Sequence, residues 1–196
     1  MKPGIFSLLI LSAIGFSSCQ KDTVTPAVTQ SPVSQKVTES TVGLSQDTVG
    51  GSIKGYLRLQ LAEDAVNTDN ILIDFNPLGK TTFNRNEDAP TLQGFGSVSL
   101  SSLSSDNVAL AINTMPLTAT GLTIGLKVGA KTTGIYKLNL TAIDAIPELF
   151  DIWLMDKYKK DSLDIRNNPG YAFNLYKADT ASYGSHRFTL VLREHH

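Results

Sequence analysis

The sequence lacks the residues with which many small exported domains form covalent cross-links. It contains one cysteine, Cys19, among 196 residues. A single thiol cannot form an internal disulfide, and an odd cysteine in an exported protein needs an explanation of its own. Residues 51–196 are enough to bury one core without disulfides or metals. Because Cys19 has no partner thiol and the domain needs no disulfide, we expect Cys19 to have a role other than cross-linking.

Histidine is also scarce. Two of the three histidines, His195 and His196, end the chain, which leaves His186 for the domain. Nucleophilic catalysis needs a serine or cysteine within reach of a base and an orienting acid, and no G-x-S-x-G sequence is present. His186 is a candidate general base, but a polar residue at a strand edge is the preferred interpretation. We therefore predict a protein that is not an enzyme and has no catalytic residue.

Paired carboxylates would be another route to hydrolysis, because glycoside hydrolysis needs two of them flanking a cleft. The acidic candidates are Asp144, Glu148, Asp151, Asp156, Asp161 and Asp164. They are expected at turns or at outward positions of strands, and no pair of them carries a motif. A small hydrolase is the least favoured hypothesis for function.

Two clusters of oxygen-bearing side chains are candidates for calcium, which takes several oxygen ligands from loops. One cluster is Asp64, Asp69 and Asn70, and the other is Glu87 and Asp88. Neither has the spacing of an EF-hand loop, and Asx residues are typical turn formers. The sequence therefore predicts no metal site and no cofactor.

No charge of one sign dominates: the formal net charge is -1. The basic residues are scattered along the chain, whereas nucleic-acid binding normally needs a basic patch or stripe. We therefore expect no nucleic-acid partner.

The hydrophobic run near the N-terminus is too short for a permanent transmembrane helix. It covers residues 5–16, about a dozen residues, whereas a spanning helix needs roughly 20. Lys2 precedes the run and two serines and Cys19 follow it, which is the layout of a secretory signal. The segment resembles a lipobox, in which the cysteine after the cleavage site is acylated, although Phe16 stands where leucine is usual. An ordinary secretory signal with Cys19 incidental is the alternative.

The sequence predicts three regions. Residues 1–18 are the lipoprotein signal peptide, residues 19–50 are the acylated cysteine and a flexible linker, and residues 51–196 are the folded domain. The linker is rich in Thr, Ser, Val, Pro and Gln without an aromatic residue, so it cannot bury enough surface to offset the entropy of ordering. A multiply acylated Cys19 would hold the protein on a membrane, because stable attachment takes more than one acyl chain.

Alternation of apolar and polar residues dominates the domain, which indicates half-buried strands. The alternating apolar residues are Leu57, Leu59 and Leu61; Ile71, Ile73 and Phe75; Val108, Leu110 and Ile112; Leu122, Ile124, Leu126 and Val128; Tyr136, Leu138 and Leu140; Phe150, Ile152 and Leu154; Tyr171, Phe173 and Leu175; and Phe188, Leu190 and Leu192. Turn signals separate these runs, and only residues 64–70 leave room for a short helical turn. The pattern predicts an all-β fold, an antiparallel and jelly-roll-like β-sandwich.

Two parts of the chain resemble known families. The start of the linker, Cys19-Gln20-Lys21-Asp22, resembles surface lipoproteins of the Bacteroidota, in which lysine and acidic residues after the acylated cysteine act as a surface-export signal. The domain resembles a β-sandwich module of large secreted or surface proteins from the same bacteria. The matching stretches are residues 56–59, 69–75, 82–83, 87–89, 99–103, 110–113, 154–157, 163–166, 171–173 and 187–190.

The resemblance implies a lipid-anchored protein of the outer membrane, exposed at the cell surface. Proteins with this module usually continue into a type IX secretion sorting domain, whereas this chain ends at His196. The lipid anchor is therefore expected to replace the type IX route. The resemblance does not supply a ligand.

Trp153 is the only tryptophan, and it alternates opposite Ile152 and Leu154, so it is expected to face outward. Together with Tyr158 it is a candidate sugar-stacking or partner-binding surface, and packing beneath another layer is the alternative. The favoured hypothesis is a surface-anchored interaction or structural module without catalytic activity. The alternative is a carbohydrate-binding lipoprotein that uses Trp153 and Tyr158. A surface protein or a glycan is the expected partner.

Overall fold

The structure, a computed structural model, describes residues 52–195 with the exception of 93 and 95. This part of the chain contains thirteen β-strands and one short 3-10 helix, η1 (Thr180–Ser182). The all-β prediction is therefore confirmed. The predicted signal peptide (1–18) and linker (19–50) lie outside the described residues.

The strands follow one another along the whole described chain. They are β1 (Ser52–Ile53), β2 (Gly55–Ala62), β3 (Thr68–Phe75), β4 (Ala89–Pro90), β5 (Val98–Leu103), β6 (Ala109–Met115), β7 (Leu117–Thr118), β8 (Leu122–Ala130), β9 (Gly134–Asp144), β10 (Phe150–Asp156), β11 (Asp161–Asp164), β12 (Gly170–Leu175) and β13 (Gly184–Glu194). Residues 64–67 form a bend between β2 and β3, where the sequence left room for one short turn.

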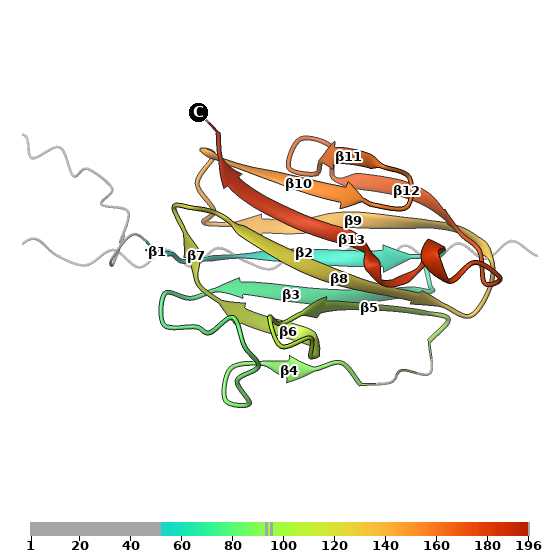
Figure 1. Ribbon diagram of the computed structural model, residues 1–196, viewed down its shortest axis with the longest axis horizontal. Coiled ribbons are helices and arrows are strands. Elements are labelled where there is room, and N and C mark those ends of the chain that lie inside the picture. The colour runs from blue at the N-terminus through green and yellow to red at the C-terminus, as the bar shows by residue number, and fades with distance from the viewer. Residues whose placement is uncertain (1–51, 93, 95, 196) are drawn as a thin grey trace, which may run out of the picture. The chain divides into compact units, whose positions relative to one another are not determined.

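Eleven of these strands form one sheet, in the order β11-β10-β13-β8-β5-β6-β3-β2-β9-β12, with β4 beside β6 (Figure 1). β1 and β7 pair separately. Neighbours in the sheet are antiparallel except β3 and β6, which are parallel, so the antiparallel prediction is wrong at that pair. The chain between them passes through β4 and β5, which supplies the long connection that parallel strands require.

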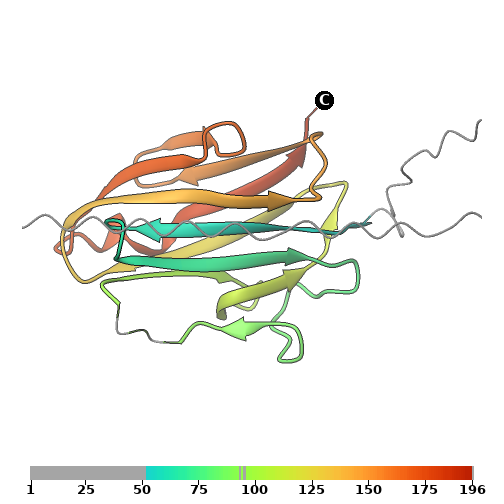
Figure 2. The same cartoon turned by 180° about the vertical axis from the view of Figure 1, so that it is seen from behind.

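The sheet folds back so that strands from its two ends face each other across the core. β12 and β13 are not paired, yet the ring centroids of Phe173 and Phe188 lie 4.7 Å apart. Figures 1 and 2 show β10, β13 and β8 on one side of the domain and β9, β2 and β3 on the other. One sheet therefore supplies both layers, and the jelly-roll-like type of sandwich stays a prediction.

The core consists largely of the alternating residues that the sequence indicates. Leu57, Leu59 and Leu61 of β2 are at most 1% exposed, and the predicted sets on β3, β10, β12 and β13 are buried in the same way. Burial of one such side chain stabilises the fold by about 1.5–3 kcal/mol. The alternation therefore identifies the inner face of most strands.

The alternation fails in β6. The sequence predicts that Ile112 lies on the inward face with Leu110, but Ile112 is 38% exposed and Asn113 beside it is 1% exposed. Along its length β6 changes partners from β5 to β3, and its pairing with β4 contains a register shift. These irregularities alter which side chains of β6 turn inward.

Candidate ligand-binding groove

The predicted lipid-attachment residue Cys19 and the predicted export signal, Gln20, Lys21 and Asp22, lie outside the described residues. Both therefore stay predictions. Within residues 52–195, leaving out 93 and 95, no helix has the length and apolar character needed to cross a membrane.

The two aromatic residues predicted to form a ligand surface, Trp153 and Tyr158, each lie against the guanidinium group of a different arginine. Trp153 is half-buried on β10, and its ring centroid lies 5.7 Å from the guanidinium carbon of Arg193. Tyr158 lies in the turn after β10, where its ring centroid is 4.9 Å from the guanidinium carbon of Arg187. The Tyr158 hydroxyl donates a hydrogen bond to Oδ2 of Asp179 at 2.8 Å. Joint use of the two rings as a sugar platform stays a prediction.

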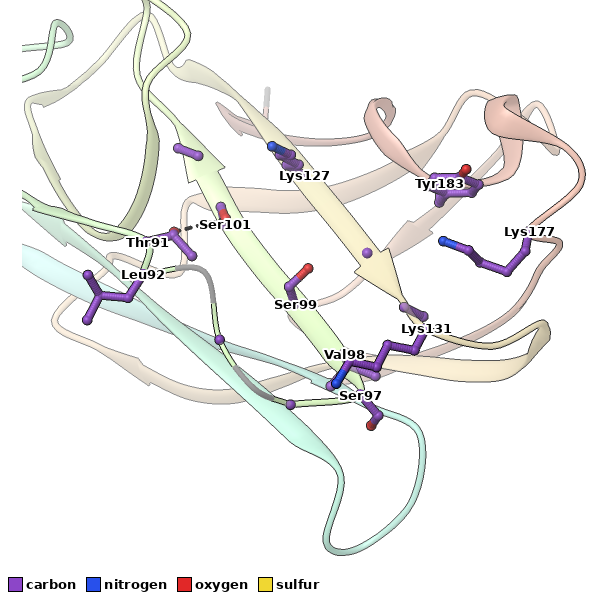
Figure 3. A pocket seen from close by; sticks show the side chains of 15 residues that line it. Thr91, Leu92, Ser97, Val98, Ser99, Ser101, Lys127, Lys131, Lys177 and Tyr183 are labelled. Carbon is purple, nitrogen blue, oxygen red and sulfur yellow. Dashed lines mark hydrogen bonds between the residues drawn. The ribbon is translucent and has the colours of Figure 1, made fainter.

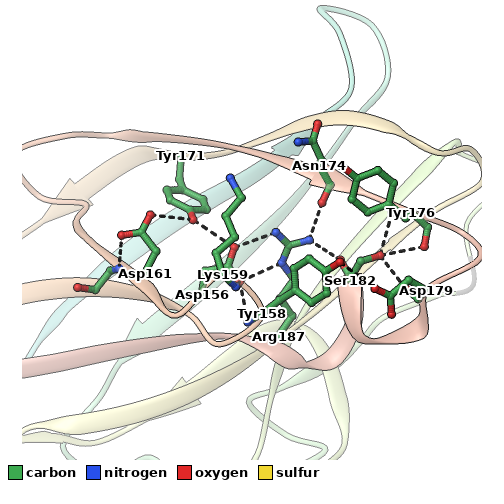
Figure 4. A network of polar contacts seen from close by, with 11 residues as sticks. Asp156, Tyr158, Lys159, Asp161, Tyr171, Asn174, Tyr176, Asp179, Ser182 and Arg187 are labelled. Carbon is green, nitrogen blue, oxygen red and sulfur yellow. Dashed lines mark hydrogen bonds and ion pairs between the residues drawn. The ribbon is translucent and has the colours of Figure 1, made fainter.

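Arg187 is the centre of a buried polar network (Figure 4). The pairing of β13 with β8 is irregular between Gly184 and Phe188, and the two consecutive side chains Arg187 and Phe188 are both buried. The Arg187 Nε and Nη2 atoms donate to the two carboxylate oxygens of Asp156 at 3.1 and 2.8 Å. This two-pronged geometry is the strong form of a charged hydrogen bond.

Further contacts engage Nη1 and the faces of the Arg187 guanidinium. Its Nη1 atom donates to the backbone carbonyls of Asn174 and Ser182. The guanidinium carbon lies 4.6 Å from the ring centroid of Phe173 and 4.7 Å from that of Phe188. Arg187 thereby connects β13 with β12, with η1 and, through Asp156, with β10, so the network stabilises one end of the domain.

The carboxylate side of the network is also fully engaged. The Tyr171 hydroxyl lies 3.1 Å from Asp156 Oδ2 and 3.2 Å from Asp161 Oδ2. Burial, and then the negative charge of Asp156, raise the pKa of Tyr171. Burial alone would raise the pKa of Asp156, but hydrogen bonds from Arg187 and from the backbone outweigh it and lower that pKa. At neutral pH the network is therefore an ion pair beside a protonated tyrosine, which supports a structural role.

The other catalytic candidates are dispersed. His186 is exposed on β13, while Asp144 and Glu148 are exposed in and after β9. Asp151 lies beside the chain end, with Oδ1 3.5 Å from Nδ1 of His195. Asp164 accepts hydrogen bonds from the side chain and backbone of Asn167, so it holds the turn after β11.

Acidic residues of the two candidate calcium clusters hold the backbone. Asp64 accepts the backbone N–H groups of Val66 and Asn67 at 2.8 Å, and Asp69 accepts that of Leu100 at 2.8 Å. Asp88 accepts the backbone N–H of Thr114 at 2.8 Å. Among the described residues, no group of three or more histidine, cysteine or acidic side chains is arranged to hold a metal ion.

A recessed polar surface lies on the outer side of β5 and β8 (Figure 3). We call it the lysine groove; its volume is about 250 Å³. Its lining residues are Thr91, Leu92, Gly94, Gly96, Ser97, Val98, Ser99, Ser101, Ala109, Lys127, Gly129, Ala130, Lys131, Lys177 and Tyr183. Each of Lys127, Lys131 and Lys177 is exposed, and none of the described lining residues is acidic.

Local geometry keeps the lysine groove open and polar. A Cβ atom on Gly129 would lie only 2.5 Å from Oγ of Ser99, so glycine lets the Ser99 hydroxyl lie against the floor. The Thr91 hydroxyl donates to Ser101 Oγ at 2.9 Å within the groove lining. Lys177 extends over the ring of Tyr183, with Nζ 4.6 Å from the ring centroid. The groove therefore combines ammonium and hydroxyl groups, which can bind an anionic or hydroxyl-rich ligand.

A second recess of about 430 Å³ continues on the outer face of β8 and β13. We call it the threonine recess, because Thr123 and Thr189 line it. Lys157 and Ser185 also contribute to it, and its described lining contains no acidic residue. Other recesses differ: the one beside the chain end contains Asp151 and Glu194 as well as Arg193.

The sequence analysis identified neither recess. The outward row Thr123, Gly125 and Lys127 is visible in the alternation of this strand and was the available signal. Lys177 and Tyr183 come from a distant part of the chain, and their approach to β8 depends on the fold.

Comparison with known proteins adds no relative. The chain matches no protein-family model, and no curated protein and no solved structure is significantly similar to it.

Proposed function

We propose that the protein is a lipid-anchored protein of the cell envelope, exposed at the outer membrane, whose β domain is a non-catalytic interaction module. The lysine groove is the observation that carries this proposal. It offers ammonium and hydroxyl groups with no carboxylate in its described lining. Complementary charge of this kind gives specificity and fast association with an acidic partner.

Two further features support the proposal. In the sequence, Cys19 follows a short apolar signal with small residues before it, which is the position of an acylated cysteine in a lipoprotein. In the domain, Asp156 and Asp164 are engaged in hydrogen bonds that hold strands and turns. Groups that stabilise the fold in this way are poorly placed for proton transfer to a substrate.

Carbohydrate binding is the second candidate function, and the hydroxyl lining of the lysine groove favours it. Ser99 is exposed on the outer face of β5 at the groove floor, whereas Ser101 on the same face is buried and accepts a hydrogen bond from Thr91. Side-chain hydroxyls both donate and accept hydrogen bonds, as sugar hydroxyls do. This version of the proposal places the glycan at the lysine groove, whereas the sequence places it at Trp153 and Tyr158.

The anchor is tested by producing the full-length protein and its Cys19→Ala variant in a diderm bacterium. Palmitate labelling and an intact mass that corresponds to a cleaved, acylated Cys19 are expected for the wild type alone. Protease treatment of intact cells should remove the wild-type protein. An unacylated wild-type protein, or one found in the cytoplasm, would refute the anchored form.

The groove is tested with galacturonate as a small acidic probe and galactose as its neutral counterpart, titrated into the full-length protein. We expect measurable binding of galacturonate, weakened in Lys127→Ala by up to about fivefold, since an exposed charge pair contributes about 0.2–1 kcal/mol. Lys137→Ala is the matched control, because Lys137 is exposed on β9 in the opposite layer. Absence of binding, or an equal effect of both variants, would contradict the proposal.

A further inference from the structure

The lysine groove and the threonine recess share one strand. Gly129 and Lys127 of β8 line the groove, and Gly125 and Thr123 line the recess. Alternate residues of a strand point to the same face, so these four positions form an unbroken row on the outside of the sheet. We call this row, with the side chains that border it, the β8 trough.

Two of the four positions of the β8 trough are glycine, and side chains of the neighbouring strand β5 occupy the space beside them. A Cβ atom on Gly125 would lie 3.1 Å from Cδ1 of Leu103, and one on Gly129 would lie 2.5 Å from Ser99 Oγ. The side chains of the neighbouring strand β5 thus lie against the β8 backbone. A ligand that passes from one recess into the other therefore lies over the side chains of Ser99, Lys127 and Leu103.

The charges along the trough have one sign. Lys157 lines the threonine recess, Lys127 lies in the row itself, and Lys177 lines the lysine groove. No acidic residue is found among the described residues that line either recess, although the chain as a whole has a net charge of -1. The trough is therefore complementary to a ligand with several negative charges along its length.

The dimensions favour an extended ligand. From Thr123 to Gly129 the strand advances by about 20 Å, at roughly 3.3 Å per residue. The groove alone, at about 250 Å³, is smaller than the roughly 300–1,000 Å³ of common small-molecule pockets. A linear polymer of several units can occupy both recesses, whereas a single small molecule leaves one of them empty.

The lining distinguishes between classes of acidic polymer. A peptide would most readily add to the edge of a sheet, but the trough lies on a face. Single-stranded nucleic acid is bound by stacking of bases on aromatic rings, and the Tyr183 ring is already covered by Lys177. Serine and threonine hydroxyls beside lysines match the hydroxyls and carboxylates of an acidic sugar chain.

Building on the proposed function, we propose that the β8 trough binds a linear acidic polysaccharide, with the polymer running along β8 from the lysine groove to the threonine recess. Lys127 contacts every bound chain, and Lys157 contacts only chains long enough to reach the recess. The affinity therefore depends on chain length, and the contribution of Lys157 appears only with longer chains.

The test is a titration of the full-length protein with galacturonate and with oligogalacturonates of increasing length, at low and high salt. We expect the affinity to rise more than about tenfold from one unit to a chain that spans the trough, since each added charge pair contributes up to about 1 kcal/mol. Salt at 1 M should remove most of this gain, because it shortens the screening length to about 3 Å.

Three variants sharpen the result. Lys157→Ala should weaken long oligomers by up to about fivefold and leave the single unit unchanged. Lys127→Ala should weaken both, and Lys137→Ala should weaken neither. If galacturonate binds but the affinity depends neither on the length of the oligomer nor on Lys157, the proposal that the polymer runs along the β8 trough is refuted, while the proposed function stands. If nothing binds, the proposed function fails as well. Equal binding of polyglutamate would overturn the assignment to polysaccharide.

Discussion

Breaking the buried pair of Arg187 and Asp156 from one side or the other should have unequal effects on stability. The side chains of Arg187 and Asp156 are 0% and 1% exposed, so either charge is left in the interior when its partner is removed. Asp156→Asn leaves a guanidinium that cannot lose its proton. Arg187→Met leaves a carboxylate that can take one up, and that retains hydrogen bonds from Tyr171 and two backbone N–H groups.

The magnitudes follow from these contacts. Asp156→Asn should lower the free energy of unfolding by about 3–5 kcal/mol, as expected for an uncompensated buried charge. Arg187→Met should cost less, about 3 kcal/mol at neutral pH. In the double variant no buried charge is left unpaired, so the combined loss should fall short of the sum of the two by about 2–3 kcal/mol.

The pH dependence provides a second signature. In the wild type the pKa of Asp156 is lowered below 3.8, so its contribution is present above about pH 4 and is lost as the pH falls further. In Arg187→Met the hydrogen bond and charge of arginine are gone, and burial raises the pKa of Asp156. The variant should therefore regain stability relative to the wild type as the pH falls from 7 toward 4.

Urea unfolding followed by fluorescence measures both effects, because the only tryptophan, Trp153, lies half-buried on β10, the strand that also carries Asp156. The single and double variants are compared at pH 7 and pH 5. Losses of no more than about 1 kcal/mol, as for an exposed pair, would refute the reasoning. So would an Arg187→Met variant that becomes relatively less stable as the pH falls.

Further substitutions test local features by thermal or urea unfolding. Gly121→Ala should destabilise the fold more than Gly184→Ala. Both glycines have positive φ angles, +84° and +88°. Only a Cβ atom on Gly121 would clash with a neighbour, the backbone carbonyl oxygen of Leu192. Gly184→Ala should lower the free energy of unfolding by about 1–3 kcal/mol from backbone strain alone. An equal loss of stability in both variants would show that the contact with the Leu192 carbonyl has no effect. Ser182→Ala should cost about 1–3 kcal/mol, because Ser182 Oγ accepts the backbone N–H of Tyr176 at 2.8 Å; a neutral result would show that this N–H finds another acceptor.

Local pattern predicts most of the fold and misses strands with few apolar residues. Strands such as β2 have an inner face made only of leucine, and their alternation is plain in the sequence. In β5 the inner set Val98 and Leu100 ends in Ser102, which is fully buried and donates to the carbonyl of Leu110. The parallel pairing of β3 with β6 joins distant segments, and alternation within a strand carries no information about its neighbours.

The site was harder to predict than the fold, because its residues are brought together by contacts between segments that are distant in the sequence. Arg187 stands next to Phe188, and strict alternation would place it on the outer face. The register shift near Gly184 accompanies its burial instead. The outward position of Lys127 follows from the sequence, whereas the placement of Lys177 in the same groove depends on the fold.

Binding of fluorescent polygalacturonate to intact cells tests the account most directly. Cells that produce the wild-type protein are compared with cells that produce Cys19→Ala or Lys127→Ala/Lys177→Ala, after the surface level of the lysine variant has been matched to wild type. We predict bright labelling for the wild type, weak labelling for the lysine variant and none for Cys19→Ala. Equal labelling of all three, or no labelling of wild-type cells, would contradict the proposal of a surface-anchored module that binds an acidic polysaccharide.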